Sequence, residues 1–213
     1  MERIKLIRPA DRSFAEKAQE HWDSVAKPLG SFGVLEEMWD RIAAVQRTVT
    51  PDISRRAVVV MCGDNGVTAE GVTQTDSSVT LACGSAIACG RSNINALAAV
   101  YNAKVLAVDV GMEGDSTCEK LINRKIAHGT GNIAAGPAMT VQQAESAIVV
   151  GMDMIGKLAD EGVKVVVTGE MGIGNTTPTA ALSSVILGLP PETVTGRGRR
   201  SHFRGTSPQD RSC

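Results

Sequence analysis

The chain has 213 residues, of which 43% are hydrophobic and 21% are charged, and its formal net charge is −1. This length is enough to bury a hydrophobic core in one large domain or two small ones. The near-neutral charge argues against general binding to nucleic acids or to an anionic membrane surface.

Two helices are predicted within residues 1–50, which we expect to form a helical N-terminal lobe. Residues 11–24 have the spacing of an amphipathic helix, and a second apolar face begins at Leu35. Between them, residues 27–33 contain one proline and two glycines. This composition interrupts regular structure and favours a linker.

The first predicted buried strand, residues 56–62, ends in a polar loop. Asp64 and Asn65 follow it, at the carboxyl end of a strand, where α/β folds bind their ligands. Both residue types also close turns with their own side chains, so a turn role stays open beside a ligand role. Residues 77–100 are rich in alanine and predict one or two helices.

A second strand is predicted over residues 104–111, with Asp109 near its end. This carboxylate is either a metal or ribose ligand or a strand-end group satisfied by backbone N–H donors. Residues 124–140 are irregular, and an ordered loop of this length is usually functional. Thr140 opens a helix through a capping box, and Gly162 closes that helix.

A glycine-rich stretch, Gly169–Pro178, follows a third short strand, residues 163–168, which we expect to be buried. At the start of a helix its backbone N–H groups would form an anion site. Thr177 is predicted as the N-cap and Pro178 as the first helical residue. Strand and helix thus alternate three times, which predicts an α/β fold, a parallel sheet flanked by helices with Rossmann-like layering, over residues 51–198.

The cysteines are scattered, with no C-x-x-C pair and no cluster of histidines. This pattern predicts reduced thiols rather than a zinc site or a disulfide framework. No apolar run approaches the roughly 18 residues of a membrane span, and the charged N-terminus lacks the apolar segment of a signal peptide. We therefore expect a cytoplasmic protein without a metal or a membrane partner.

The glycine-rich stretch fits none of the common phosphate loops. It lacks the lysine of a Walker A loop, and its glycines do not have the spacing of the dinucleotide fingerprint. The adjacent acidic residues that a diphosphate-donor phosphoribosyltransferase needs are also missing, because Asp109 precedes Val110. The stretch can instead hold a phosphate monoester through backbone N–H groups and the hydroxyls of Thr176 and Thr177. Glu170 would then face the sugar and offset positive charge at its anomeric carbon, or it would interact with the dipole of the next helix.

Five motifs follow one another along the chain: KPxGSxGxLE at 27–36, GDxGVxxEGV at 63–72, VDVG at 108–111, GTxNIxxGPAMT at 129–140 and GEMGIGNTTP at 169–178. Together they resemble the ordered motifs of the nicotinate-nucleotide:dimethylbenzimidazole phosphoribosyltransferase family, and the resemblance extends to about residue 198. It implies transfer of phosphoribose from nicotinate mononucleotide to 5,6-dimethylbenzimidazole or a related lower-ligand base. The product would be α-ribazole phosphate for cobalamin biosynthesis.

The resemblance also implies inversion at the anomeric carbon, no cofactor, and a homodimer whose sites lie near the subunit interface. The partners that it implies are the two small-molecule substrates. The site residues that it implies are Glu170, in a supporting catalytic role, and, for substrate binding, Gly172, Ile173, Gly174, Asn175, Thr176, Thr177, Asp64 and Pro137.

Three departures from the family pattern affect these expectations. Asn65 stands where the family usually has histidine, and Cys83 stands where some members have glutamine, so the accepted base stays open. Where the family continues with a phosphate-site lysine and a general-base glutamate, residues 199–213 are rich in arginine. We expect a truncated or frameshifted product with a disordered, non-family tail.

Activity of such a product would be weak or lost, since general-base help is worth about 10²–10⁴-fold. A tail that binds nucleic acid is the rival interpretation of the arginines, although it lacks interleaved aromatic residues. The alternative function is a non-catalytic mononucleotide-binding module, or a partner subunit, that needs another chain to complete its site.

Overall fold

The computed structural model describes residues 2–196 and divides the chain into two compact units. The first unit is Met1–Arg55 and the second begins at Arg56, whereas the sequence places the end of the helical lobe at residue 50. The tail expected over residues 199–213 lies outside the described residues.

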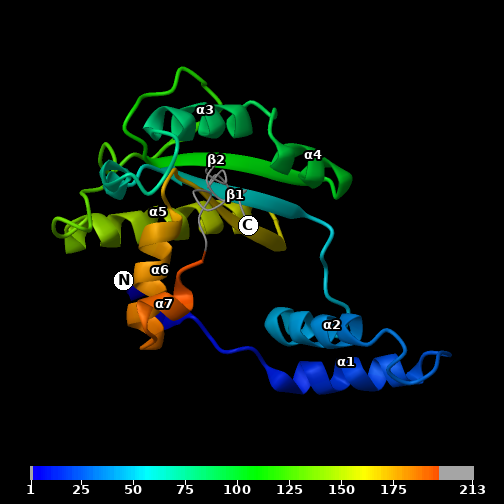
Figure 1. Ribbon diagram of the computed structural model, residues 1–213. Helices are drawn as coiled ribbons and strands as arrows, with labels where there is room; N and C mark the ends of the chain where they lie inside the picture. The colour runs from blue at the N-terminus through cyan, green and yellow to red at the C-terminus, as the bar shows by residue number, and fades with distance from the viewer. Residues whose placement is uncertain (1, 197–213) are drawn as a thin grey trace, which may run out of the picture. The chain divides into compact units, whose positions relative to one another are not determined.

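The first unit contains a short 3-10 helix, η1 (Glu2–Leu6), and two α-helices, α1 (Arg12–Ser24) and α2 (Val34–Gln46) (Figure 1). The helices that the sequence predicts here are confirmed. They pack through small residues, because Ala18 of α1 and Ala43 of α2 are almost fully buried.

The segment between α1 and α2 is fixed to α2. Glu36 accepts a hydrogen bond from the Phe32 N–H at 3.1 Å and pairs with the Lys27 ammonium at 3.0 Å. The side chains of Lys27 and Glu36 are both less than a tenth exposed. Lys27 and the Phe32 N–H together hold the pKa of Glu36 below its ordinary value. Residues 27–33 are therefore a tethered turn rather than a free linker.

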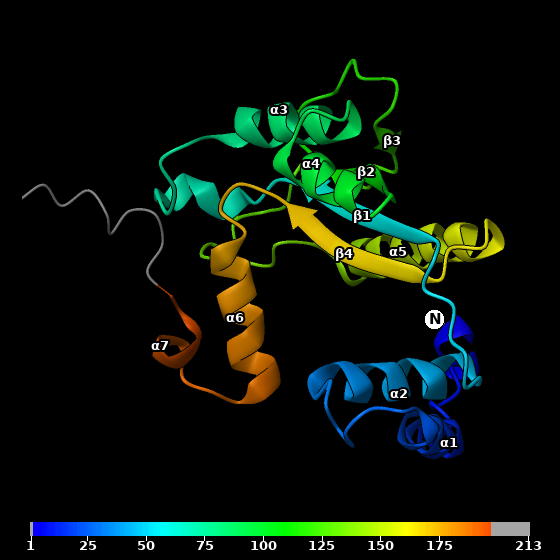
Figure 2. The same cartoon turned by 90° about the vertical axis from the view of Figure 1, so that its right-hand side faces the viewer.

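The second unit is a four-stranded parallel sheet with helices on both faces (Figures 1 and 2). Its strands lie in the order β3-β2-β1-β4, with α3 (Ser77–Ala88) and α4 (Asn93–Val100) over one face and α5 (Val141–Asp160) over the other. The strands are β1 (Arg56–Gly63), β2 (Ala103–Gly111), β3 (Ile122–Asn123) and β4 (Val165–Met171). The predicted α/β fold is confirmed, and the two-residue β3 is an addition.

Alternate residues of β1 enter two separate cores, as the pleat of a strand requires. Val58, Val60 and Cys62 belong to a core with Ile87 of α3 and Ala98 of α4. On the other face, Ala57 and Val59 belong to a core with Met154 and Leu158 of α5. Strand β1 therefore packs against α3 and α4 on one face and against α5 on the other.

For the third strand, predicted over residues 163–168, both the predicted bounds and the predicted burial are wrong. Gly169 and Glu170 belong to β4 and not to a loop, because they pair with Val60 and Met61 of β1. Val167 is 50% exposed, since β4 is an edge strand within the described residues and its faces are only partly covered.

Helix α6 (Thr176–Leu187) follows β4 and precedes the short α7 (Pro191–Val194). The predicted N-cap at Thr177 is wrong, because the cap is Asn175 and the helix begins at Thr176, two residues earlier than predicted. Pro178 is still within the first turn, where a missing N–H costs no helical hydrogen bond. No residue of α6 is buried, and Val185 and Ile186 are 82% and 77% exposed.

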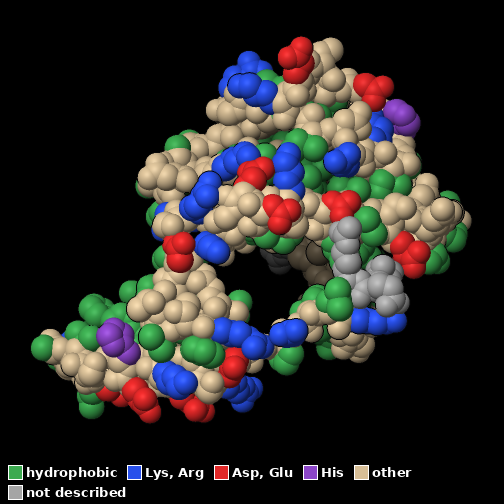
Figure 3. Space-filling model, turned by 180° about the vertical axis from the view of Figure 1, so that it is seen from behind, with side chains coloured by type: hydrophobic (Ala, Val, Ile, Leu, Met, Phe, Trp, Pro, Cys, Tyr) green, Lys and Arg blue, Asp and Glu red, His purple; other side chains and the backbone are tan. Residues whose placement is uncertain are grey.

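Charged side chains of both signs are interspersed on the face shown in Figure 3. Within residues 2–196 no helix combines the length and the apolar character that a membrane crossing demands. The cytoplasmic location expected from the sequence stays a prediction.

We expect the Leu158→Ala substitution to lower the free energy of unfolding by about 2–5 kcal/mol, because it leaves a cavity between α5 and the sheet. Leu158 is 1% exposed, whereas Leu97 on α4 is 63% exposed and provides a matched control. Leu97→Ala should change stability by no more than about 0.5 kcal/mol. Urea unfolding of both variants measures the difference, and equal losses would contradict the assigned core.

Candidate functional site

The site lies where the order of the strands reverses. The chain passes from β1 to β2 through α3 and α4 on one face of the sheet, and from β3 to β4 through α5 on the other (Figure 2). The connections that follow the neighbouring strands β1 and β4 therefore start from one point at the carboxyl edge of the sheet. Such a switch point is where open α/β sheets bind ligands.

Two backbone segments meet at this point too closely for a side chain. A Cβ on Gly172, the residue after β4, would lie 2.3 Å from the carbonyl oxygen of Gly63 at the end of β1. A Cβ on Gly66 would likewise lie 2.5 Å from the carbonyl oxygen of Thr130. These two glycines are required for close contact between loops.

Ile173, in the middle of the glycine-rich loop, is held by side chains from two other elements. The Asn65 amide donates to the Ile173 carbonyl oxygen at 3.1 Å, and the Ile173 N–H donates to the Thr80 hydroxyl of α3 at 3.0 Å. Thr80 is fully buried. Both backbone polar groups of Ile173 are therefore used within the protein, although the sequence predicts this residue as a ligand contact.

Asp64 has a structural role between loops and also presents one oxygen that the described residues leave without a donor. Its carbonyl oxygen accepts the Thr130 N–H at 3.1 Å and its Oδ2 accepts the Glu113 N–H at 2.9 Å, so it joins the loop after β1 to the loops after β2 and β3. The residue is 2% exposed, yet its Oδ1 has no hydrogen-bond partner among the described residues. A buried carboxylate oxygen without a donor is costly, so this atom is suited to accept a hydrogen bond from a ligand.

Asp109 has a structural role. Its Oδ1 accepts the N–H groups of Gly111 and Met112 at 3.0 and 2.9 Å, and Lys125 lies 3.5 Å from its Oδ2. Of the two roles that the sequence allowed, the structure favours the strand-end carboxylate bound by backbone donors. Across residues 2–196 no group of three or more His, Cys, Asp and Glu side chains is arranged to hold a metal ion.

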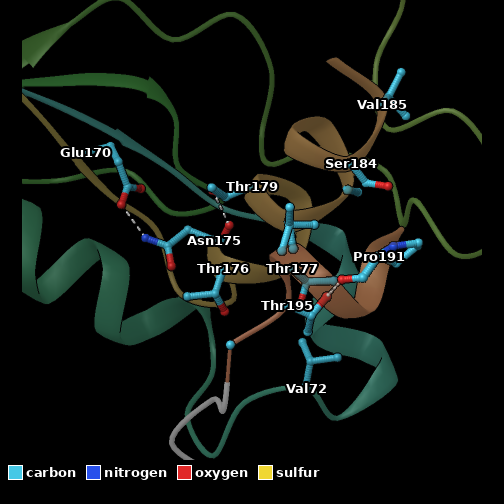
Figure 4. Close-up of a pocket in the computed structure, with 14 residues that line it drawn as sticks. Val72, Glu170, Asn175, Thr176, Thr177, Thr179, Ser184, Val185, Pro191 and Thr195 are labelled. Carbon is cyan, nitrogen blue, oxygen red and sulfur yellow. Dashed lines mark hydrogen bonds between the residues drawn. The ribbon is translucent and has the colours of Figure 1, made fainter. Parts of the chain in front are cut away.

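The start of α6 offers hydrogen-bond donors beside a carboxylate. Glu170, at the end of β4, accepts a hydrogen bond from the side-chain amide of Asn175, and the two side chains point toward each other in Figure 4. In the described part of the chain, the N–H groups of Gly174 and Thr176 donate to no protein acceptor. The dipole of α6 adds partial positive charge at this end.

Two cavities open at this edge of the sheet. The larger, of about 950 Å³, is lined by residues of α6 and α7 and includes Thr176 and Thr177 (Figure 4). The smaller, of about 370 Å³, lies among the carboxyl ends of β1, β2 and β4 and includes Asp64. Three residues line both cavities: Glu170, Asn175 and Thr179.

The structure thus brings together some of the residues predicted from the sequence and leaves others outside the cavities. Gly172, Ile173, Gly174 and Pro137 line neither cavity, and Pro137 is exposed. Thr179 and the apolar wall of the smaller cavity escaped sequence reasoning, because their apolar or helical pattern predicts only a strand, a helix or a loop and not a ligand contact. The large apolar residues of that wall are Met61, Val110, Ile126, Met139, Met171 and Leu182.

Comparisons with known proteins show which family the chain resembles. A family model described as a phosphoribosyltransferase matches residues 7–207. The chain is 42% identical over 198 residues to the nicotinate-nucleotide–dimethylbenzimidazole phosphoribosyltransferase of Geobacter sulfurreducens, and 40% identical over 197 residues to that of Ruminiclostridium cellulolyticum. Both alignments cover 92% of this chain but 56% of the relative.

The same similarity is present in three dimensions. The crystal structure of nicotinate-nucleotide-dimethylbenzimidazole phosphoribosyltransferase from Thermus thermophilus matches with a TM-score of 0.83 at 40% identity. The match covers 87% of this chain and 57% of that one. The chain therefore spans little more than half the length of the relatives that it matches.

Substituting Gly172 by alanine should lower the free energy of unfolding by about 1–3 kcal/mol, because the new methyl group would overlap the Gly63 backbone. Gly156 of α5 is the matched control, since a Cβ there would meet no atom within 4 Å. Gly156→Ala should raise stability by about 0.5–1 kcal/mol, as alanine favours a helix interior. Urea unfolding compares the two, and a neutral Gly172→Ala would refute the close approach.

Proposed function

We propose that this chain, which belongs to the nicotinate-nucleotide–dimethylbenzimidazole phosphoribosyltransferase family, transfers phosphoribose from nicotinate mononucleotide to 5,6-dimethylbenzimidazole or a related base. The product is α-ribazole phosphate, a precursor of the cobalamin lower ligand. The observation that carries the proposal is the pair of cavities that share Glu170, Asn175 and Thr179, because a transferase needs two ligands that meet at one wall.

The larger cavity takes the mononucleotide. The free N–H group of Thr176, with the hydroxyls of Thr176 and Thr177, provides donors for its phosphate at the positive end of α6. Glu170 lies in the shared wall, where its carboxylate meets the ribose and offsets positive charge that develops at the anomeric carbon. The Glu170 carboxylate and the phosphate are both negatively charged and repel each other, so a position of Glu170 against the ribose is favoured over one beside the phosphate.

The smaller cavity takes the base. Its volume of about 370 Å³ and its apolar side chains suit a flat bicyclic ring. Asp64 Oδ1 accepts the ring N–H, which leaves the lone pair of the other ring nitrogen free for attack. The buried Oδ1 of Asp64 thus fixes the orientation of the benzimidazole ring.

The reaction exchanges one carbon–nitrogen bond for another. The benzimidazole nitrogen forms a bond to C1′ of the ribose as the bond from C1′ to the nicotinate nitrogen breaks, and the electron pair of that bond leaves with nicotinate. The ring N–H proton of the acceptor passes to the Asp64 carboxylate. Attack from the face opposite the leaving group inverts the configuration at C1′.

We also propose that two copies of the chain associate through α6. Four neighbouring apolar residues of this helix are more than half exposed, and association would remove them from water. They are Leu182, Val185, Ile186 and Leu187. The same exposed face favours a second candidate function, a mononucleotide-binding module that is catalytic only when a different chain covers α6.

Incubation of the chain with nicotinate mononucleotide and dimethylbenzimidazole, followed by mass spectrometry, separates the two functions. Product formation by the chain alone supports the transferase. Tight binding of the mononucleotide by calorimetry without product favours the binding module, and the absence of both binding and product refutes both candidates.

For the active chain we expect Asp64→Asn to lower kcat by about 10²–10⁴-fold, since the amide cannot take the proton. Glu170→Gln should lower kcat/KM about 10²-fold through lost charge stabilisation. Asp160→Asn and Glu145→Gln, at exposed positions of α5, are matched controls that should keep wild-type rates. An Asp64→Asn variant with wild-type kcat would contradict the proposed role of this carboxylate.

The proposed association predicts that Ile186→Lys raises the dissociation constant of the dimer at least about tenfold, because a charge would enter an apolar interface. Ile148→Lys on α5, where the isoleucine is 46% exposed, is the matched control and should leave association unchanged. Light scattering with size-exclusion chromatography measures both variants. A monomeric wild-type chain at high micromolar concentration would rule out the dimer.

A further inference from the structure

The segment that follows β2 runs beside α3, as the trace between β2 and β3 shows in Figures 1 and 2. Two residues of the helix, and Cys89 at its C-cap, contact alternate residues of this segment. Three pairs of residues meet along the line: Leu81 with Gly114, Ser85 with Ser116, and Cys89 with Cys118.

The spacing of these pairs is matched in the two elements. Four residues of an α-helix rise about 6 Å, and two residues of an extended chain rise about 6.6 Å. A Cβ on Gly114 would lie 2.8 Å from Leu81, so the two elements are in tight contact at the first pair. The Ser85 and Ser116 hydroxyl oxygens are 2.7 Å apart at the second. The third pair is therefore brought together by the register of the whole segment.

We propose that Cys89 and Cys118 form a reversible intramolecular disulfide and that this pair is a redox-responsive site. Their Sγ atoms are 2.7 Å apart, close to the length of about 2.05 Å of a disulfide bond. Both residues are half-buried and are followed in sequence by exposed residues, so a small oxidant can reach them.

The surroundings favour Cys118 as the thiol that reacts first. The Cys89 thiol and the backbone N–H groups of Lys120 and Leu121 lower the pKa of Cys118. By contrast, burial raises the pKa of Cys62 to about 12, which keeps that thiol protonated and unreactive.

With hydrogen peroxide as oxidant, the Cys118 thiolate attacks one peroxide oxygen, the O–O bond breaks, and hydroxide leaves. The sulfenic acid that forms is attacked by the Cys89 sulfur, which expels the second oxygen as hydroxide. The thiol protons convert both hydroxides to water. In total, two thiols are oxidised to one disulfide and one peroxide is reduced to two waters. A dithiol reductant reverses the change.

The experiment treats the folded chain with hydrogen peroxide, alkylates the remaining thiols, and maps the cysteines by mass spectrometry. Cys213 lies outside the described residues, so a Cys213→Ser background removes its thiol. Because the tryptic peptide that contains Cys89 also contains Cys62 and Cys83, a Cys83→Ser variant serves as the matched control. We expect a link between this peptide and the one containing Cys118 that persists in Cys83→Ser, disappears in Cys89→Ser, and is lost on treatment with dithiothreitol.

A second measurement covers the case in which the variants do not fold. In the wild-type chain the oxidised form should show a raised Tm, which a dithiol should lower again, because the link spans residues 89–118 and restricts the unfolded chain. The proposal is overturned if Cys89 and Cys118 both remain alkylatable after oxidation of the folded chain, or if Cys118 links to Cys83 instead.

Discussion

The close approach in the second unit between the backbones at Gly63 and Gly172 is the constraint on which the rest of the candidate site depends. The adjacent parallel strands β1 and β4 end side by side, and the chain leaving β4 can contact the end of β1 only through a residue without a side chain. This contact places Ile173 within reach of Asn65 and Thr80. Those two bonds fix the glycine-rich loop, and the fixed loop determines where α6 begins.

Most polar residues of the motifs have a structural use in addition to any contact with a ligand. The Thr130 hydroxyl accepts the Gly66 N–H at 3.1 Å, and the Asn132 amide donates to Glu70 at 2.6 Å, so the long loop after β3 is bound to the segment after β1. Within the described residues, the atoms left for ligands include one oxygen of Asp64, the Glu170 carboxylate, the hydroxyls of Thr176 and Thr177, and the free N–H groups at the start of α6. A site with few free polar atoms in a fixed frame has little conformational entropy to lose on binding.

The sequence was sufficient to predict the parallel sheet and its covering helices, because β1 and β2 are short apolar runs and α5 has apolar periodicity and a capping box. It failed at β4, where Gly169 and Glu170 look like loop residues locally but pair with β1. Hydrogen bonding to a neighbouring strand is a tertiary effect that no local pattern contains. Asp64 and Glu170 were found as candidates because they stand in polar, glycine-rich motifs. Thr179 and the apolar wall around Met139 were missed because only the tertiary structure brings them to the cavities.

The two cavities have no separate walls where they meet, since Glu170, Asn175 and Thr179 contribute to both. A change in any of these side chains alters the surroundings of both ligands at once. A substitution at these positions that changes the affinity for one proposed ligand should therefore also change the affinity for the other. Under the proposed function, variation that broadens the range of accepted bases should accumulate on the far side of the smaller cavity, around Ile126 and Met139, which line that cavity and not the larger one.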